Sequence, residues 1–297
     1  MRLDESFAPA EDGARLYCRI VGDGAETLLV PNAVWLEKLV EPLARGRRLV
    51  LYDLRSRGRS ERVTDPARLG LAVETRDLEA VRRHVGAERI ALLGHSYPAT
   101  TIALYAMDHP ERVTRLLMVG AMAPSRLPYF TRPFPPAAVL LATPGAKHLE
   151  ELRAAGADKS DPAGYARAFM REFLMPSQLA DPAKAADVPL DACDHPNEWP
   201  DQWLPLFADH VLPSFGDWDY RPRLSRLTMP LLVVHGAQDR LPLDGARDWV
   251  RGSPDARLLV IDGSGHYPFV EQPDVFYPAA ERFLSGAWPE AAAVVSR

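Results

Sequence analysis

The first third of the chain contains three short, almost purely apolar runs, at residues 28–30, 49–52 and 90–93. Runs of this kind are typical of strands that are buried on both faces, as in a parallel sheet covered by helices. Between the second and third runs, residues 71–85 place Leu78, Val81 and Val85 on one side of a predicted helix. The alternation of strand and helix predicts an α/β fold, with a mostly parallel sheet flanked by helices.

The same patterns predict further strands at residues 14–21, 116–119, 231–234 and 257–261, and helices at 99–107 and 276–284. The alternation stops between Pro124 and about Arg223, in a stretch rich in proline and aromatic residues. A segment of roughly a hundred residues is too long for a structureless loop inside a compact domain. We therefore predict a core formed by residues 1–123 and 226–297, interrupted by a mainly helical cap at 124–225.

Ser96 lies where a predicted buried strand meets a predicted helix, in the sequence Gly94-His95-Ser96-Tyr97-Pro98. Such a turn exposes the serine hydroxyl at the carboxyl edge of the sheet, and the N–H of Tyr97 is an oxyanion donor by position. The usual pattern is Gly-x-Ser-x-Gly, and Pro98 replaces its last glycine. Proline is tolerated in a first helical turn, although it disfavours helical angles at the preceding residue. The alternative interpretation is a serine that only caps a helix.

Asp239 and His266 each follow another predicted strand, and His266 stands in a loop with flanking glycines. Taken singly, Asp239 is equally explained as a helix cap and His266 as a surface residue. However, Ser96, Asp239 and His266 occur in that order after separate strands, and parallel strands present such loops at one edge. The combination predicts a Ser-His-Asp triad that requires no cofactor and no metal.

With these segments the chain resembles the α/β-hydrolase superfamily, and specifically its capped, proline-iminopeptidase-like branch. The matching segments are residues 53–60, 94–98, 235–239 and 263–268, with 271–273 behind them. The resemblance covers roughly residues 12–122 and 226–286, and it implies a hydrolase with the triad above. Where the family usually has His-Gly after the first parallel strand, this chain has Pro31-Asn32-Ala33-Val34. By position, the resemblance makes the N–H of Ala33 the second oxyanion donor, with the Asn32 amide near the site.

The predicted cap contains an acidic and aromatic stretch without lysine or arginine between residues 187 and 219. One interpretation is an aromatic pocket whose carboxylates attract an amine; the other is a solvated face whose tryptophans pack on the core. Asp194-His195 lacks the further ligands that a metal site needs. The candidate substrate-binding residues are Asn32, Trp35, Glu198, Trp199, Trp203 and Tyr267.

Composition narrows the class of protein. The 297 residues carry a net charge of −5, without the basic surplus expected of a nucleic-acid-binding protein. The two cysteines, Cys18 and Cys193, predict free thiols. Neither a secretory signal nor an apolar run long enough for a membrane span is recognisable, so a cytoplasmic location is expected. The expected partner is a small acyl substrate, and the sequence does not indicate an oligomeric state.

Four functions remain open at this point. The first is a carboxylic-ester hydrolase that forms an acyl-enzyme on Ser96. The second is an aminopeptidase of the proline-iminopeptidase type. The third is acyl transfer or cyclisation by the same triad, and the fourth is a ligand-binding hydrolase fold without catalysis.

Overall fold

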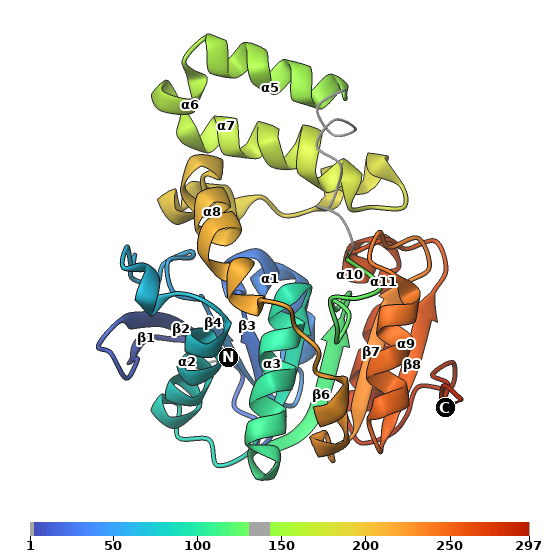
Figure 1. Cartoon of the computed structure of the whole chain (residues 1–297). Coiled ribbons are helices and arrows are strands. Elements are labelled where there is room, and N and C mark those ends of the chain that lie inside the picture. Colours follow the sequence, from blue (N-terminus) through green and yellow to red (C-terminus); the bar gives the residue numbers. More distant parts are fainter. Residues whose placement is uncertain (1–2, 131–142, 297) are drawn as a thin grey trace.

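The computed structural model describes residues 3–130 and 143–296, and it is built around an eight-stranded sheet (Figure 1). Across the sheet the strands are β1 (Leu3–Pro9), β2 (Arg15–Val21), β4 (Arg48–Tyr52), β3 (Thr27–Pro31), β5 (Ile90–His95), β6 (Val113–Val119), β7 (Leu231–Gly236) and β8 (Ala256–Ile261). From β4 to β8 neighbouring strands run parallel, whereas β2 is antiparallel to both β1 and β4. The predicted mostly parallel sheet is confirmed. The patterns did not predict β1, an edge strand whose residues are mostly polar or exposed.

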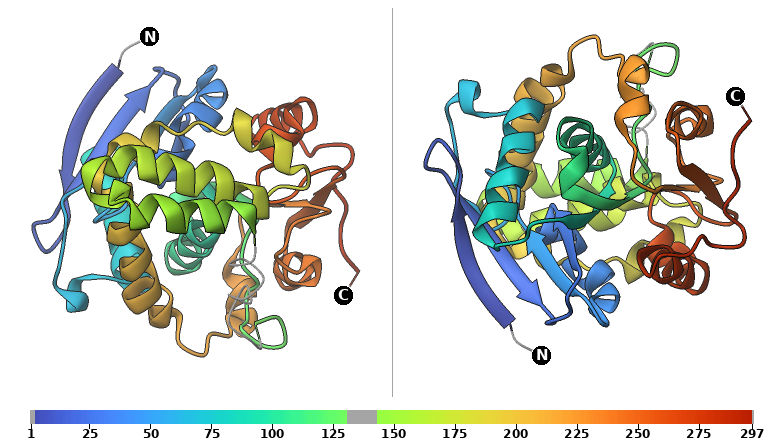
Figure 2. Two further views of the ribbon diagram at one scale, coloured as in Figure 1. Left: turned by 90° about the horizontal axis from the view of Figure 1, so that it is seen from above. Right: turned by 90° about the horizontal axis from the view of Figure 1, so that it is seen from below.

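Helices cover both faces of the sheet (Figure 2). The core helices are α1 (Ala33–Val40), α2 (Leu71–His84), α3 (Tyr97–Asp108), α9 (Leu243–Gly252), α10 (Pro268–Glu271) and α11 (Pro273–Leu284). One apolar cluster joins alternate strand residues such as Leu29 to α2, α3 and α9. The other joins the intervening residues, such as Leu28 and Val30, to α1 and α11. This two-sided burial explains why the parallel strands are apolar without alternation.

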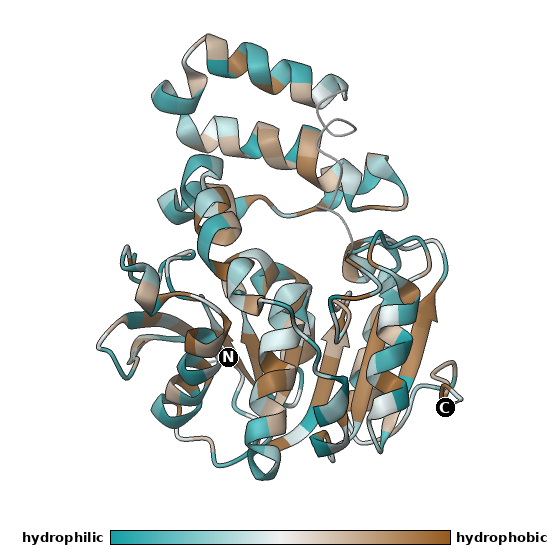
Figure 3. Cartoon of the chain, viewed as in Figure 1, coloured by the Kyte–Doolittle hydropathy of each residue, from teal (hydrophilic) through white to brown (hydrophobic). Residues whose placement is uncertain are grey.

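We call residues 124–225 the insert. Its helical elements include α5 (Pro144–Ala154), α6 (Ala157–Ser160), α7 (Pro162–Ala168), the π-helix η4 (Phe169–Leu174) and α8 (Pro200–Leu206). Helices α5, α6, α7 and α8 stand above the carboxyl edge of the sheet (Figure 1), whereas the last residues of the insert descend beside α3, where Arg223 pairs with Asp108. The described part is mainly helical, as predicted, and has an apolar cluster of its own around Phe169, Met170 and Cys193. Figure 3 shows a mixture of polar and apolar segments on these helices, in contrast to the apolar strands below. No helix in the described ranges is both long and apolar enough to cross a bilayer.

Candidate active site

Ser96 lies on the tight turn between β5 and α3. Its φ of 62° and ψ of −136° form a strained conformation, which is typical of a nucleophile turn. The turn packs closely because position 94 is glycine: a Cβ there would lie 2.7 Å from the Cα of Ala99. Helix α3 begins at Tyr97, directly after Ser96 and two residues before the bound taken from the apolar pattern, with Pro98 in its first turn. Pro98 therefore leaves Tyr97 within the helix, contrary to the conformational bias that we expected.

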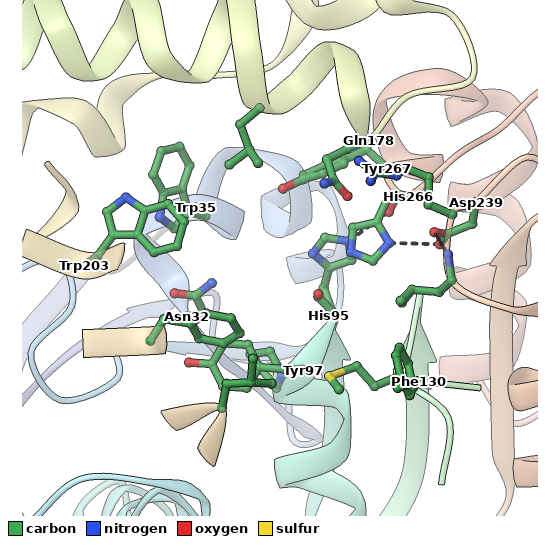
Figure 4. A pocket seen from close by; sticks show the side chains of 18 of the residues that line it. Asn32, Trp35, His95, Tyr97, Phe130, Gln178, Trp203, Asp239, His266 and Tyr267 are labelled. Carbon is green, nitrogen blue, oxygen red and sulfur yellow. Dashed lines mark hydrogen bonds and ion pairs between the residues drawn. The ribbon is translucent and has the colours of Figure 1, made fainter. Parts of the chain in front are cut away.

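His266 and Asp239 lie together above the ends of β7 and β8. His266 Nδ1 is 2.9 Å from Asp239 Oδ2 (Figure 4), and the other carboxylate oxygen accepts the Leu241 N–H at 2.9 Å. Burial opposes ionisation of Asp239, but the nearby His266 and these hydrogen bonds hold the pKa of the carboxyl below its usual value. The contact fixes the imidazole with Nε2 as its second nitrogen available for proton transfer.

Two neighbours support the His266 ring. His95 Nε2 is 2.8 Å from the main-chain oxygen of His266, and the two rings lie 4.6 Å apart. Burial, with His266 beside it, lowers the pKa of His95 to about 3, so His95 is neutral and donates this hydrogen bond. Gly120 lies behind the ring with φ of 53°, and a Cβ there would be 2.9 Å from His266 Nδ1. The position therefore requires glycine.

The insert is tied directly to the loop that carries His266. The His266 N–H donates to the oxygen of Gln178 at 2.8 Å. Glu271, which is 1% exposed, accepts the N–H of Ala180 through one carboxylate oxygen at 2.5 Å and that of Gly265 through the other at 2.7 Å. Insert and loop thus share one buried carboxylate.

Ser96, Asp239 and His266 all line one pocket of about 800 Å³ between the sheet edge and the insert. Most of the lining is apolar or aromatic, and Figure 4 shows the labelled side chains around the cavity. This setting is typical of a small-molecule site, in which a few polar groups orient an otherwise apolar ligand.

The loop after β3 brings a second helix N-terminus to the pocket. Asn32 has φ of 63° and ψ of 43°, and α1 begins at Ala33. The N–H of Val34 donates to Asp53 Oδ1 at 2.7 Å, which anchors the loop to the segment after β4. The N–H groups of Ala33 and Tyr97 are each the first of a helix, so neither has an acceptor within that helix.

Of the six residues predicted to bind substrate, four line the pocket: Asn32, Trp35, Trp203 and Tyr267. Trp199 lies outside the lining, because it packs within the insert and its Nε1 donates to the oxygen of Cys193. Glu198 also lies outside the lining and is 1% exposed.

The Glu198 carboxylate is fully engaged by the core. It accepts from Arg57 Nε and Nη2, with the shortest contact at 2.6 Å, from the Gly58 N–H at 2.7 Å and from Trp35 Nε1 at 2.5 Å. With its charge paired to Arg57, Glu198 is not available to attract an amine. The other acids of the stretch, Asp187, Asp191, Asp194, Asp201, Asp209, Asp217 and Asp219, are exposed. The solvated interpretation therefore holds for these aspartates, whereas Trp203 and Trp218 line the pocket.

A buried polar network below the pocket was missed by sequence reasoning. Glu74 of α2 is 3% exposed and accepts from the hydroxyls of Tyr97 at 3.3 Å and Thr101 at 3.1 Å. Burial raises the pKa of Glu74 to about 7. Arg57, which lines the pocket, was missed as well. No local sequence signal distinguishes these two from surface charges on a helix and a loop.

Metal ligation finds no support in the described ranges, where no group of three or more His, Cys, Asp or Glu side chains could hold an ion. Cys18 and Cys193 are both buried and free, as predicted.

The sheet order, the turn at Ser96 and the His266–Asp239 contact define the class of protein. The chain belongs to the α/β-hydrolase fold family, whose model matches residues 31–273. This confirms the resemblance inferred from the sequence.

The chain is 26% identical to the 2-hydroxy-6-oxononadienedioate/2-hydroxy-6-oxononatrienedioate hydrolase of Cupriavidus pinatubonensis, over 94% of each chain. It is also 26% identical to the proline iminopeptidase of Lactobacillus delbrueckii subsp. bulgaricus, covering 92% of this chain and 94% of the relative. An esterase from Exiguobacterium antarcticum has a similar structure, with a TM-score of 0.68 at 19% identity, covering 95% of this chain and all (100%) of that one. These similarities support a hydrolase and the shared fold.

Proposed function

We propose that this protein is a serine hydrolase that cleaves a carboxylic ester through an acyl-enzyme on Ser96. The observation that carries the proposal is the 2.9 Å contact between His266 and buried Asp239, beside a strained serine in the same pocket. Because Nδ1 faces Asp239, Nε2 is the nitrogen that accepts the Ser96 proton during attack on the acyl carbon. Asp239 holds the ring in this tautomer and stabilises the imidazolium that forms.

The two steps then follow from proton balance. The imidazolium returns its proton to the departing alkoxide, which leaves as the alcohol and gives the acyl-enzyme. Water, deprotonated by His266, attacks the acyl-enzyme, and the carboxylic acid leaves as Ser96 regains its proton. In both steps the N–H groups of Tyr97 and Ala33 are the proposed donors to the oxyanion. Each such donor contributes about 3–4 kcal/mol to the transition state.

The test is turnover of 4-nitrophenyl acetate and butyrate by the wild type and by Ser96→Ala. We expect hydrolysis by the wild type and a loss of about a thousandfold or more in the variant. A fluorophosphonate probe should label the wild type only. Equal rates in the two proteins, or no labelling, would contradict the proposal and favour a non-catalytic ligand-binding role.

A proline-iminopeptidase activity is the second candidate, because a relative over almost the whole chain bears that name. The pairing of Glu198 with Arg57 counts against it, since an aminopeptidase needs free acceptors for the substrate amine. Release of naphthylamine from proline-β-naphthylamide at a rate above that of ester hydrolysis would favour this candidate. Acyl transfer is tested by adding an alcohol to the ester assay, because transfer of the acyl group to this alcohol gives a new ester as a second product.

A further inference from the structure

The pocket has two sides of different chemistry. Figure 4 shows Trp35, Trp203 and Asn32 grouped on one side, and Asp239 and Phe130 on the other. The leaving group of an ester must lie beside His266, from which it takes a proton. The acyl chain therefore extends to the side of Trp35 and Trp203, which we call the tryptophan side.

Arg57 belongs to the tryptophan side. Its Cζ lies 5.4 Å from the centre of the Trp203 ring, and it shares the Glu198 carboxylate with Trp35. The Nε–H and one Nη2–H donate to Glu198, which occupies one edge of the guanidinium plane. A guanidinium has five N–H donors in a fixed plane, so both Nη1 donors and one on Nη2 remain. Nη1 makes no hydrogen bond to any residue in the described ranges, although Arg57 is only 7% exposed and lines the pocket.

Trp203 adds a second donor that has no partner in the part of the chain that the structure describes. Its Nε1 is buried and has no hydrogen-bond acceptor among the described residues. Buried donors cost free energy unless an acceptor satisfies them. The tryptophan side thus has more donors than the described residues satisfy, and Asn32 Oδ1 is a buried acceptor there that also lacks a partner among them.

We infer that the tryptophan side is a subsite for a carboxylate at the far end of the substrate's acyl chain, held by the free edge of Arg57 and by Trp203 Nε1. A carboxylate matches two parallel N–H groups of a guanidinium in shape and charge. Glu198 lies behind Arg57, outside the lining, and fixes the plane of the guanidinium without filling the pocket. The inference rests on the proposed ester hydrolysis and specifies its substrates as monoesters of dicarboxylic acids.

The test compares two matched series of 4-nitrophenyl esters. One series consists of monoesters of linear dicarboxylic acids from succinate to suberate, and the other of neutral esters with the same numbers of acyl carbons. We expect the best monoester to exceed its neutral counterpart in kcat/KM by about tenfold or more. Arg57→Lys keeps a cation beside Glu198 but removes the guanidinium N–H groups that face away from Glu198. Trp203→Phe keeps an aromatic ring but removes the indole N–H. Each should lower the ratio of the two kcat/KM values about fivefold or more.

Lys38→Gln is the control for general charge effects, because Lys38 is 62% exposed and pairs with Asp191 outside the pocket. It should leave both kcat/KM values unchanged. A wild-type ratio of monoester to neutral-ester kcat/KM of one or less overturns the inference, and so does a ratio that neither pocket variant changes. In either case, turnover of the neutral esters that depends on Ser96 still supports the proposed function. If neither series is hydrolysed, the inference is tested by measuring the binding of glutarate and of pentanoate to Ser96→Ala through tryptophan fluorescence. Tighter binding of glutarate than of pentanoate supports the subsite, and equal binding overturns it.

Discussion

Replacing Glu198 by glutamine tests how the insert is held on the core. The wild-type carboxylate is 1% exposed and pairs with Arg57, which is 7% exposed, while also accepting from Gly58 and Trp35. Glutamine keeps the size and one acceptor, but it leaves the Arg57 charge buried without a counter-charge. Removing one partner of a buried ion pair costs about 3–5 kcal/mol. We therefore expect Glu198→Gln to lower the free energy of unfolding by this amount.

Asp191→Asn is the matched control. Asp191 is also an acid of the insert that pairs with a cation of the core, Lys38, at 2.8 Å, but the two side chains are 59% and 62% exposed. An exposed pair contributes about 0–1 kcal/mol. Urea unfolding followed by tryptophan fluorescence measures both variants. A cost for Glu198→Gln within about 1 kcal/mol of the control would refute the reasoning, because burial would then make no difference.

Three further predictions concern the site. Glu74→Gln tests the raised pKa: the native carboxyl titrates near 7 and the unfolded one near 4.5, so Glu74 costs stability as pH rises between these values. Between pH 4.5 and 8, the free energy of unfolding of the variant should rise by about 3 kcal/mol relative to that of the wild type. Urea unfolding at a series of pH values measures this, and a constant difference between the two proteins would contradict it. Asp239→Asn should lower kcat about 10³–10⁴-fold with KM little changed, since the imidazole loses its fixed tautomer; a tenfold loss or less in 4-nitrophenyl butyrate hydrolysis would count against the triad. Gly120→Ala should lower kcat by crowding His266, whereas Gly86→Ala, with φ of 67° and no neighbour within 4 Å, carries only the backbone strain. Equal activity of the two glycine variants in the same assay would exclude crowding.

The parts of the site that sequence reasoning located are those with a local signal. A run of apolar residues, a tight turn and a polar residue after the strand are all contained in short segments such as 90–98. The fold could be predicted because such apolar runs recur along the chain. Strand β1 was not predicted because an antiparallel edge strand need not be apolar. The start of α3 lies two residues before the bound taken from the apolar pattern, because Tyr97 and Pro98 already belong to the first helical turn, where proline is tolerated.

The roles of Glu198 and Arg57 have no such signal. They are 141 residues apart in the chain, and their partnership depends on how the insert meets the loop after β4. The sequence of an acidic stretch does not show whether a given carboxylate is exposed, as in Asp201, or buried, as in Glu198. Only the contacts decide whether such a carboxylate serves a ligand or the fold.

The carboxylate of Glu271 has a mechanical consequence. One oxygen holds Ala180 of the insert and the other holds Gly265, the residue before His266. A shift of this part of the insert that widened the pocket would pull on the peptide that orients the imidazole. This part of the insert and the loop that carries His266 are therefore linked mechanically through one buried side chain. On the proposed mechanism, a rearrangement of the insert at Ala180 therefore also affects proton transfer by His266.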